Sequence, residues 1–557
     1  MNKKVNLVLF DDSTFPIEWK LGEVYRVKFS VQDVFNVITQ HIKTTSEAVL
    51  FWHPDSGKPD QEKVQHLLGQ AIDVWHAGLR MGMNGLPGTI DFVVPTWMLN
   101  CDPDPKIEST SWRLSLRACL IRTDVLRKMG GIYPEFQTLE AASLEMGHRF
   151  ITRGVLTRYI PSLISSQKQL NNVSLPFEDE LRFIDFCFGR KWTLWAWARA
   201  VMTRYATFQK AWSSWNEVKK SKGREESDPY QRVFANSAAP HKKSLVSVLI
   251  PTLQRYSYLR TILRQFKEQT IKPFEIIVID QTPMSQRDVE LRKEFEDLPL
   301  KLIYLEKPGQ CSARNAGLKM AEGDFILFLD DDDEITPDLI ESHLQSLHLF
   351  QNRVSSGVAD EVGAGPLPKN FRYRRTSDVF PTNNTMIHRG VLEKSGLFDL
   401  AYDHKQRADG DLGMRVYLAG EQMILNSKIS VLHHHAPQGG LRVHKARVIT
   451  YASSRSNLFH RHLPTDSEIY LARRYFTPRQ VEEMLWLRIF GVFTIWGGVF
   501  KKIGKLFIAF LTLPNTVGVT LSRYRKASIM LKQFPQIPFF EKESMPFNDG
   551  RRILCAE

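Results

Sequence analysis

Short apolar runs alternate with amphipathic stretches through the middle of this chain. Four such runs occupy residues 245–250, 275–280, 301–305 and 325–329. They have the length and the β-branched content of buried strands. The intervening residues have helical spacing after the first run and again at 285–297, and a glycine-containing loop opens a short helix near 310. Strand and helix in alternation predict an α/β unit with a mainly parallel sheet and right-handed crossovers.

The fourth run ends in four consecutive carboxylates, Asp330 to Asp333. Adjacent carboxylates repel, so one or more would take up a proton unless a cation lies among them. Mg²⁺ and Mn²⁺ prefer such oxygen ligands together with substrate phosphates. Open α/β sheets also bind their ligands at the carboxyl ends of the strands. The run therefore indicates a divalent metal site, and the alternative is a solvated acidic turn.

Other polar residues follow the same strands in order. Pro251 and Thr252 close the first run, Asp280 closes the second, and Arg314 and Asn315 open the helix that precedes the fourth. Each motif is weak alone, but as a set, with the aspartate run, they are specific. The set resembles the family 2 glycosyltransferases.

The resemblance covers roughly residues 245–435 and implies a GT-A fold that binds a nucleotide-activated sugar. By the resemblance, Asp280 would bond the base, Arg314 would approach the nucleotide and Asp330 would touch the ribose. The implied donor contacts are Pro251, Thr252, Asp280, Arg314, Asn315, Asp330 and Asp331. Asp332 would ligate the Mg²⁺ or Mn²⁺ that bridges the diphosphate, with Asp330 as a further ligand.

A general base must take a proton from the acceptor hydroxyl. Family members carry a Glu-Asp pair for this, followed by Asp-Leu and an Arg, and the matching stretch here is 408–415. Ala408 replaces the Glu, while the Asp survives as Asp409. We expect Asp409 to be the base, with Asp411 as its competitor and an exposed acidic loop as the structural alternative.

Three adjacent histidines follow a predicted strand at 429–432. Strand alternation would aim His433 and His435 at one face and His434 at the other. Some GT-A enzymes place a metal ligand here, so His433 is the expected third ligand, and a polar loop is the alternative. Arg442, after two glycines, is a candidate contact for the donor phosphates.

The first part of the chain repeats this pattern in damaged form. Residues 125–130 match residues 391–396, and Gly147 and Gly154 match Gly413 and Gly420, all at the same offset (391 − 125 = 266; 420 − 154 = 266). His53 and Asp55 stand where Asp330 and Asp332 do, and Ser143 stands where Asp409 does. We expect a second, degenerate GT-A-like unit that is catalytically dead, or else a weakened site in which His53 and Asp55 still bind a metal.

The chain has 74 Lys and Arg against 61 Asp and Glu, a net charge of +13. No zinc pattern, aromatic RNA-binding motif or helix-turn-helix signature accompanies this excess, which argues against a nucleic-acid partner. An anionic membrane surface is the better partner. The cysteines are scattered and odd in number, and the start has no signal-peptide core, so we expect a cytoplasmic protein.

Two segments rich in aromatic and basic residues support the membrane prediction. Residues 186–220 hold five tryptophans among Lys and Arg, in a helix suited either to lipid headgroups or to packing between domains. Residues 484–519 are almost membranous, but the uncharged run 489–500 is shorter than the roughly 20 residues of a spanning helix. An interfacial amphipathic helix is expected, and a re-entrant hairpin or a buried core helix are the alternatives.

Together these patterns predict four parts. They are a degenerate unit at 1–166, a Trp-rich helical linker at 167–243, a catalytic GT-A domain at 244–445 and a helical, membrane-associating region at 446–557. We expect a metal-dependent inverting glycosyltransferase of surface polysaccharide or glycoconjugate synthesis, acting on a saccharide or lipid-linked acceptor at the inner face of the cell membrane. The alternative is a non-catalytic sugar- or nucleotide-binding scaffold. An aspartyl phosphotransferase is excluded because the fifth residue from Asp330 is Glu334.

Overall fold

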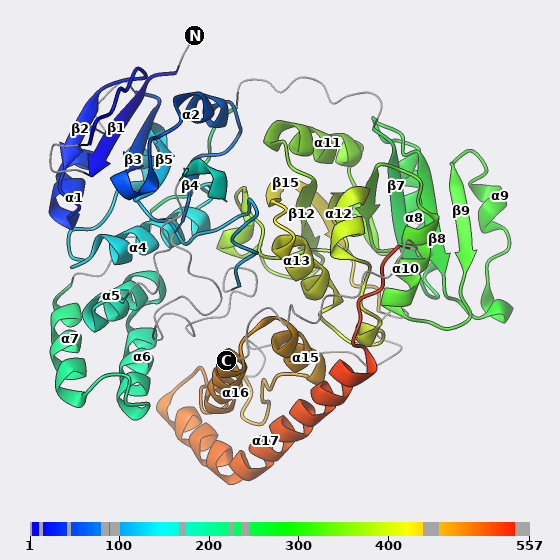
Figure 1. Ribbon diagram of the computed structural model, residues 1–557. Coiled ribbons are helices and arrows are strands. Elements are labelled where there is room, and N and C mark those ends of the chain that lie inside the picture. The colour runs from blue at the N-terminus through cyan, green and yellow to red at the C-terminus, as the bar shows by residue number, and fades with distance from the viewer. Residues whose placement is uncertain are drawn as a thin grey trace.

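The computed structural model describes residues 3–10, 15–41, 46–78, 89, 101–165, 174–221, 227–234, 244–437 and 456–540. Within these ranges the chain forms two α/β units, each built on one sheet, and a group of helices that lies below them in Figure 1. The boundaries predicted at residues 166, 243 and 445 fall outside the described residues.

The second unit, green and yellow in Figure 1, is built on a nine-stranded sheet in the order β11-β15-β12-β14-β10-β7-β8-β9, with β13 beside β15. Its strands are β7 (Val246–Thr252), β8 (Glu275–Asp280), β9 (Leu300–Tyr304), β10 (Phe325–Phe328), β11 (Asp333–Ile335), β12 (Val354–Glu361), β13 (Arg375–Thr376), β14 (Thr385–His388) and β15 (Met423–His433). Strands β9, β8, β7 and β10 run parallel, and β14 runs antiparallel to β10. The predicted mixed, mainly parallel sheet is confirmed, and its four parallel strands are the four apolar runs.

Helices cover this sheet as the amphipathic spacing predicts. They are α8 (Tyr256–Phe266), α9 (Leu291–Glu294), α10 (Gln310–Met320), α11 (Leu339–Phe350), α12 (Arg389–Ser395) and α13 (Ala408–Leu418). The helix predicted at 285–297 was too long, because only residues 291–294 of that range form α9. Leu291 and Phe295 are the side chains of this stretch that reach the core, which is too few to bury one face of a longer helix.

The N-terminal unit, blue in Figure 1, is built on a six-stranded sheet in the order β2-β1-β3-β5-β4-β6. Its elements are β1 (Val5–Phe10), β2 (Val24–Val27), α1 (Val31–His41), β3 (Ala48–Trp52), α2 (Gln61–Leu68), β4 (Val74–His76), β5 (Ala118–Arg122), α3 (Thr123–Met129), α4 (Leu139–Thr152) and β6 (Thr157–Tyr159). Both the order and the directions match the second unit's β8-β7-β10-β14-β12-β15. The N-terminal sheet has no counterpart of β9 among the described residues. This agrees with the small number of residues that precede His53 and Asp55 in the chain.

The repeat extends to single residues. Helices α3 and α12 begin and end at the same offset (389 − 123 = 266; 395 − 129 = 266). Each is followed by a glycine with positive φ, Gly130 at 71° and Gly396 at 79°. This backbone conformation is strained for residues that carry a Cβ. A conformational requirement has thus been kept in both copies, which supports a common origin for the two units.

Two sets of helices complete the molecule. The first is α5 (Phe177–Phe188), α6 (Arg190–Met202) and α7 (Phe208–Lys220), and the second is α15 (Asp466–Tyr475), α16 (Pro478–Gly491) and α17 (Val499–Gln533). The single helix expected at 484–519 is therefore two helices, separated at residues 492–498, where Gly497 has φ 128°. By length and composition α17 is long and apolar enough to cross a membrane.

Candidate active site

The carboxyl ends of the parallel strands surround a pocket of about 220 Å³. Its lining includes Pro251, Thr252, Arg255, Gln281, Gly309, Arg314, Asp330, Asp331, Asp332, His433 and His435. Most of the predicted donor and metal residues therefore meet in one place. This is the edge at which open α/β sheets bind ligands.

The four aspartates of the run have different surroundings. Asp331 accepts a hydrogen bond from Thr252 Oγ1 (2.7 Å) and lies 3.0 Å from Arg255 Nη1. The backbone N–H of Ala436 donates to Asp332 Oδ2 (2.7 Å). Asp333 lies 2.9 Å from His433 Nδ1. Asp331, Asp332 and Asp333 are buried and Asp330 is half-buried, so the run is a built cluster and not a solvated turn.

Burial perturbs the titration of this cluster. It raises the pKa of Asp331 to about 7, although the charge of Arg255 opposes the rise. It also raises the pKa of Asp333 to about 7, against the hydrogen bond from His433. Burial alone would lower the pKa of His433, but Asp333, Asp330 and Asp332 together raise it to about 9. A metal ion that takes His433 as a ligand must therefore displace its proton.

Two groups of side chains in the pocket are close enough to share a metal ion. Asp330, Asp332 and His433 form the first, and Glu361, His433 and His435 form the second. Oδ1 of Asp332 is buried and accepts no hydrogen bond among the described residues, although Arg255 Nη1 is 3.1 Å away. Carboxylates suit both Mg²⁺ and Mn²⁺, and an imidazole is a permissible further ligand for Mn²⁺. The first group therefore fits the expected metal.

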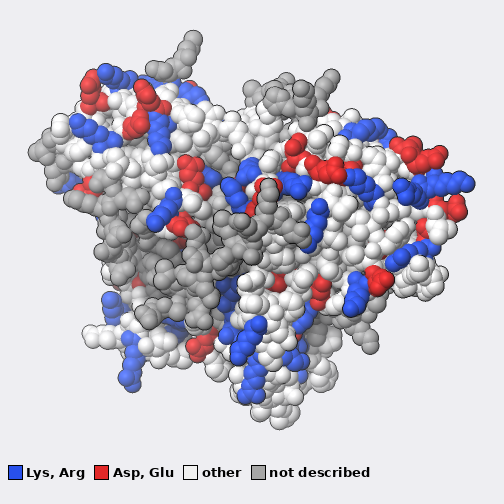
Figure 2. Space-filling view, turned by 45° about the vertical axis from the view of Figure 1, so that its right-hand side comes forward, with Lys and Arg blue, Asp and Glu red and all other residues white. Residues whose placement is uncertain are grey.

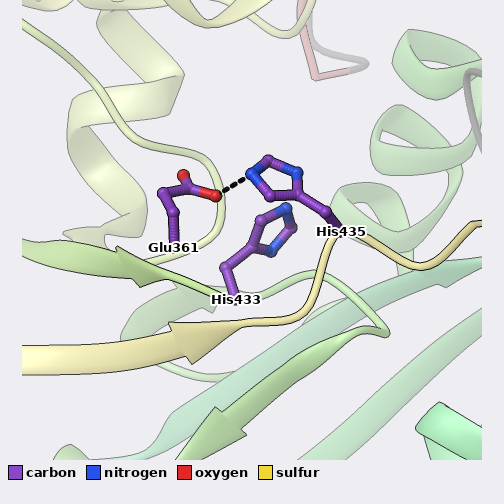
Figure 3. Close-up of side chains that lie close together, drawn as sticks. All are labelled: Glu361, His433 and His435. Atoms are coloured by element: carbon purple, nitrogen blue, oxygen red, sulfur yellow. Dashed lines mark ion pairs between the residues drawn. The ribbon is translucent and has the colours of Figure 1, made fainter. Parts of the chain in front are cut away.

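The second group confirms the predicted alternation along β15. Figure 3 shows Glu361, His433 and His435 turned toward one another, with an ion pair between Glu361 and His435. His434 instead contacts Glu334 and the ring of Tyr258. Glu361 is opposite His433 in the parallel pairing of β12 with β15. Nothing near Glu361 in the sequence signals its place in the site, because that place comes from strand pairing.

Arg255 is another pocket residue that the sequence did not indicate. It lies three residues beyond the end of β7, immediately before α8, and within 3.1 Å of both Asp331 and Asp332. Its guanidinium offsets part of the negative charge of the cluster. Its position three residues after Thr252 was the one available signal in the sequence. The Pro251-Thr252 motif alone does not call for a basic residue there.

Some of the residues expected around the nucleotide line the pocket, and others have side chains that are engaged elsewhere in the protein. Arg314 lies in the pocket and pairs with Asp330 at 2.8 Å. Asn315 turns away, and its amide exchanges two hydrogen bonds with the backbone of Phe398. Asp280 is buried and accepts hydrogen bonds from Tyr256 Oη (2.6 Å) and the backbone of Thr282 (2.9 Å). Arg442 lies outside the described residues.

The two candidate bases have opposite surroundings. Asp409 is exposed in the first turn of α13. Asp411 is fully buried, 2.8 Å from Arg415 Nη2, and accepts a hydrogen bond from Tyr475 Oη (2.7 Å). At offset 266 the N-terminal unit holds the same kind of ion pair, Glu145 with Arg149 at 3.1 Å. This pair lies in a unit whose Asp409 counterpart is Ser143, so it serves folding there.

The N-terminal counterpart of the metal site is weak. His53 Nδ1 lies 3.6 Å from Asp55, whose side chain is 58% exposed. Among the described residues, this pair has no third potential ligand close enough to share an ion with it. Whether this unit is catalytically dead or keeps a weakened metal site stays a prediction.

Part of this chain is similar to known proteins. Residues 247–400 match the family model described as glycosyl transferase family 2. An uncharacterized glycosyltransferase of Bacillus subtilis, YwdF, is 40% identical over 167 residues, which cover 28% of this chain and 62% of YwdF. The poly(ribitol-phosphate) beta-N-acetylglucosaminyltransferase TarS of Staphylococcus aureus is 33% identical over 196 residues, or 33% of this chain and 34% of TarS.

The solved structure of TarS residues 1–349 is 16% identical, covers 54% of this chain and 99% of its own, and has a TM-score of 0.33. The matches span less than two thirds of the length of these curated relatives. The matched residues contain the pocket's β7, β8 and β10 and the whole aspartate run. Residues 247–400 therefore form a domain of the family 2 glycosyltransferase type.

Proposed function

We propose that this chain is an inverting glycosyltransferase that moves a sugar from a nucleotide diphosphate to a hydroxyl of a saccharide or lipid-linked acceptor. We assign it to the synthesis of a surface polysaccharide or another glycoconjugate. The observation that supports this most is the pocket in which Asp330, Asp332, His433 and Arg314 converge at the carboxyl edge of the sheet. That combination of oxygen ligands, imidazole and guanidinium suits a diphosphate with its metal ion.

In this proposal the residues of the pocket bind and orient the donor. Asp330, Asp332 and His433 would hold a divalent ion, Mg²⁺ or Mn²⁺, which when bound supplies Lewis-acid stabilisation to the leaving diphosphate. Arg314 would add a donor of charge-assisted hydrogen bonds to the same phosphates. The positive charge of Arg255 would offset the repulsion between the buried carboxylates of Asp331 and Asp332 when both are ionised.

A thermal-shift panel of UDP-, GDP-, dTDP- and CMP-sugars, with and without Mn²⁺, tests the donor site. We expect one nucleotide to raise the melting temperature, and only when metal is present. A ligand at a hundred times its Kd adds about 2.7 kcal/mol to the stability of the folded state. If no donor gives a shift in well-folded protein, the scaffold alternative, which the loss of the Glu at Ala408 favours, replaces this proposal.

Asp409 is the general base in this proposal because it is the exposed member of the pair at the start of α13. The Asp409→Asn variant should still bind donor and give the same thermal shift. Its rate of sugar transfer should fall by roughly 10²–10⁴-fold, the usual contribution of a general base. A variant that turns over at the wild-type rate would exclude Asp409 from this role.

We further place the enzyme in the cytoplasm, attached peripherally to the inner face of the cell membrane. The exposed apolar side chains of α16 and α17 support this placement. A lipid-linked acceptor would be within reach at such a surface.

A further inference from the structure

The long helix α17 distributes its side chains in an unusual way between its two faces. The residues that it buries against the protein are mostly small or polar: Lys505, Ala509, Thr516, Thr520, Ala527 and Met530. Large apolar residues point outward instead, and Phe500, Phe507 and Leu511 are 92%, 63% and 66% exposed. A surface helix in water has the reverse arrangement, with its apolar stripe toward the core. The outward face of α17 is therefore suited to an apolar medium.

Specific contacts hold α17 along the protein surface. Lys505 Nζ donates hydrogen bonds to the carbonyls of Asn457, Leu458 and His460 at 2.8–3.1 Å. About two turns beyond the middle of the helix, Arg523 donates to the carbonyls of Leu463 and Pro464. A helix that crossed a membrane would have to break these bonds and leave α15. The contacts favour a helix that lies in the plane of the membrane surface.

The charge around this helix has one sign. From residue 484 to residue 540 the sequence contains no Asp or Glu. It contains Arg488, Lys501, Lys502, Lys505, Arg523, Arg525, Lys526 and Lys532. In the space-filling view the lowest lobe of the molecule is mostly white, with blue side chains above it (Figure 2). Apolar side chains beside cations complement an anionic lipid surface.

Helix α6, nearly 300 residues earlier, belongs to the same surface. The ring of Trp195 lies 6.0 Å from that of Phe490, and Arg199 pairs with Glu483 at 2.9 Å. Residues 189–216 again contain Lys and Arg but no Asp or Glu. Exposed Leu194 and Met202 extend the apolar area. The two aromatic segments noted in the sequence are thus parts of one surface.

A pocket of about 490 Å³ lies where α6 meets the start of α17. Its apolar lining comes from Phe493, Ile495, Trp496, Ile503 and Leu506. Lys191 and Lys502 supply two ammonium groups at the same pocket. The combination suits an amphiphile whose phosphate contacts lysine while its hydrocarbon contacts the aromatic wall.

We propose that α6, α16 and α17 form a docking surface for an anionic phospholipid bilayer, and that this pocket takes a phospholipid headgroup. The inference rests on the membrane placement proposed above and names the surface and the lipid class responsible. Aromatic side chains of α16 and α17 enter the headgroup layer, and the lysines meet the lipid phosphates. The helix lies flat, because its polar stripe is bonded to the protein.

Flotation with vesicles, in the absence of any nucleotide sugar, tests the docking surface. Full-length protein should float with vesicles of equal parts phosphatidylcholine and phosphatidylglycerol, and much less with phosphatidylcholine alone. The triple variant Phe500→Asp, Phe507→Asp, Leu511→Asp should lose at least about a hundredfold in binding, since each buried side chain contributes on the order of tenfold. Val233→Asp, at a site that is 91% exposed elsewhere on the chain, is the matched control and should float like wild type.

The lysines are tested by Lys191→Gln combined with Lys502→Gln. Binding to the mixed vesicles should fall by about thirtyfold, at roughly fivefold for each positive charge, while binding to phosphatidylcholine should not change. Equal binding of wild type to both vesicles, or wild-type flotation of the triple variant, would overturn the proposal. Flotation needs no donor, so failure to bind vesicles and failure to bind a nucleotide sugar are separate results. The triple variant should keep any donor-induced thermal shift.

Discussion

Replacing Asp332 by alanine should abolish metal-dependent donor binding and lower sugar transfer by on the order of a thousandfold or more. Asp332 is 2% exposed, and one of its carboxylate oxygens accepts no hydrogen bond among the described residues. Loss of a bound ion removes several kcal/mol of stabilisation from the leaving diphosphate. Both effects are measured on the same protein, by the Mn²⁺-dependent thermal shift and by initial rates with the donor that the panel identifies.

The N-terminal unit supplies a matched control for this variant. Asp55 is the counterpart of Asp332 (332 − 55 = 277), as His53 is of Asp330 (330 − 53 = 277). Asp55→Ala should leave donor binding and transfer unchanged, because its site has no third ligand within reach among the described residues. The fold should survive Asp332→Ala as well, since Arg255 keeps Asp331 as a partner. Unchanged, metal-dependent donor affinity in the Asp332 variant would contradict the metal assignment.

The predictions that held are those that rest on local periodicity. The apolar runs became β7, β8, β9 and β10. His433 and His435 lie on one side and His434 on the other, as predicted, although β15 ends at His433 and His435 has a positive φ. The repeat was visible because a constant offset of 266 preserves side chains at helix ends and in the ion pair of α13. These features depend on neighbours a few residues away, which sequence spacing specifies.

What could not be predicted depends on contacts between distant residues. Arg255 reaches Asp331 across 76 residues and Glu361 faces His433 across 72. Asn315 has a motif position suited to a ligand, but its amide is used by the backbone of Phe398. A motif specifies the residue type at a position. Whether the side chain faces the pocket depends on the packing of segments that the motif does not contain.

The C-terminal region illustrates the same limit. Its composition indicated an amphipathic helix, but not the break at residues 492–498 nor the face of α17 that packs on α15. The inverted arrangement of α17 emerges only once Lys505 and Thr516 are seen to face the protein. Hydrophobic periodicity identifies an apolar stripe without saying whether protein or lipid covers it.

Asp411→Ala should destabilise the protein by about 3–5 kcal/mol, the usual consequence of removing one partner from a buried ion pair. Asp411 is fully buried, and Arg415 is only 5% exposed. The variant leaves the guanidinium without its carboxylate and Tyr475 Oη without its acceptor. Urea unfolding followed by fluorescence measures the loss. Glu145→Ala, at the same place in the N-terminal unit, should be similarly destabilising because Arg149 is equally buried.

The comparison with Asp409→Asn then assigns the base. Asp409 lies two residues away but is exposed, so its replacement should change the free energy of unfolding by no more than about 0.5 kcal/mol while it abolishes most transfer. The two variants are thus distinguished by two assays. The Asp411 variant should lose stability in urea unfolding, whereas the Asp409 variant should keep its stability and lose sugar transfer. If Asp411→Ala instead kept full stability and lost transfer, Asp411 would be the base, and its pairing with Arg415 would have to open during the reaction. The ion pair at offset 266 argues against that outcome, because Glu145 and Arg149 keep it in a unit where Ser143 has replaced the proposed base.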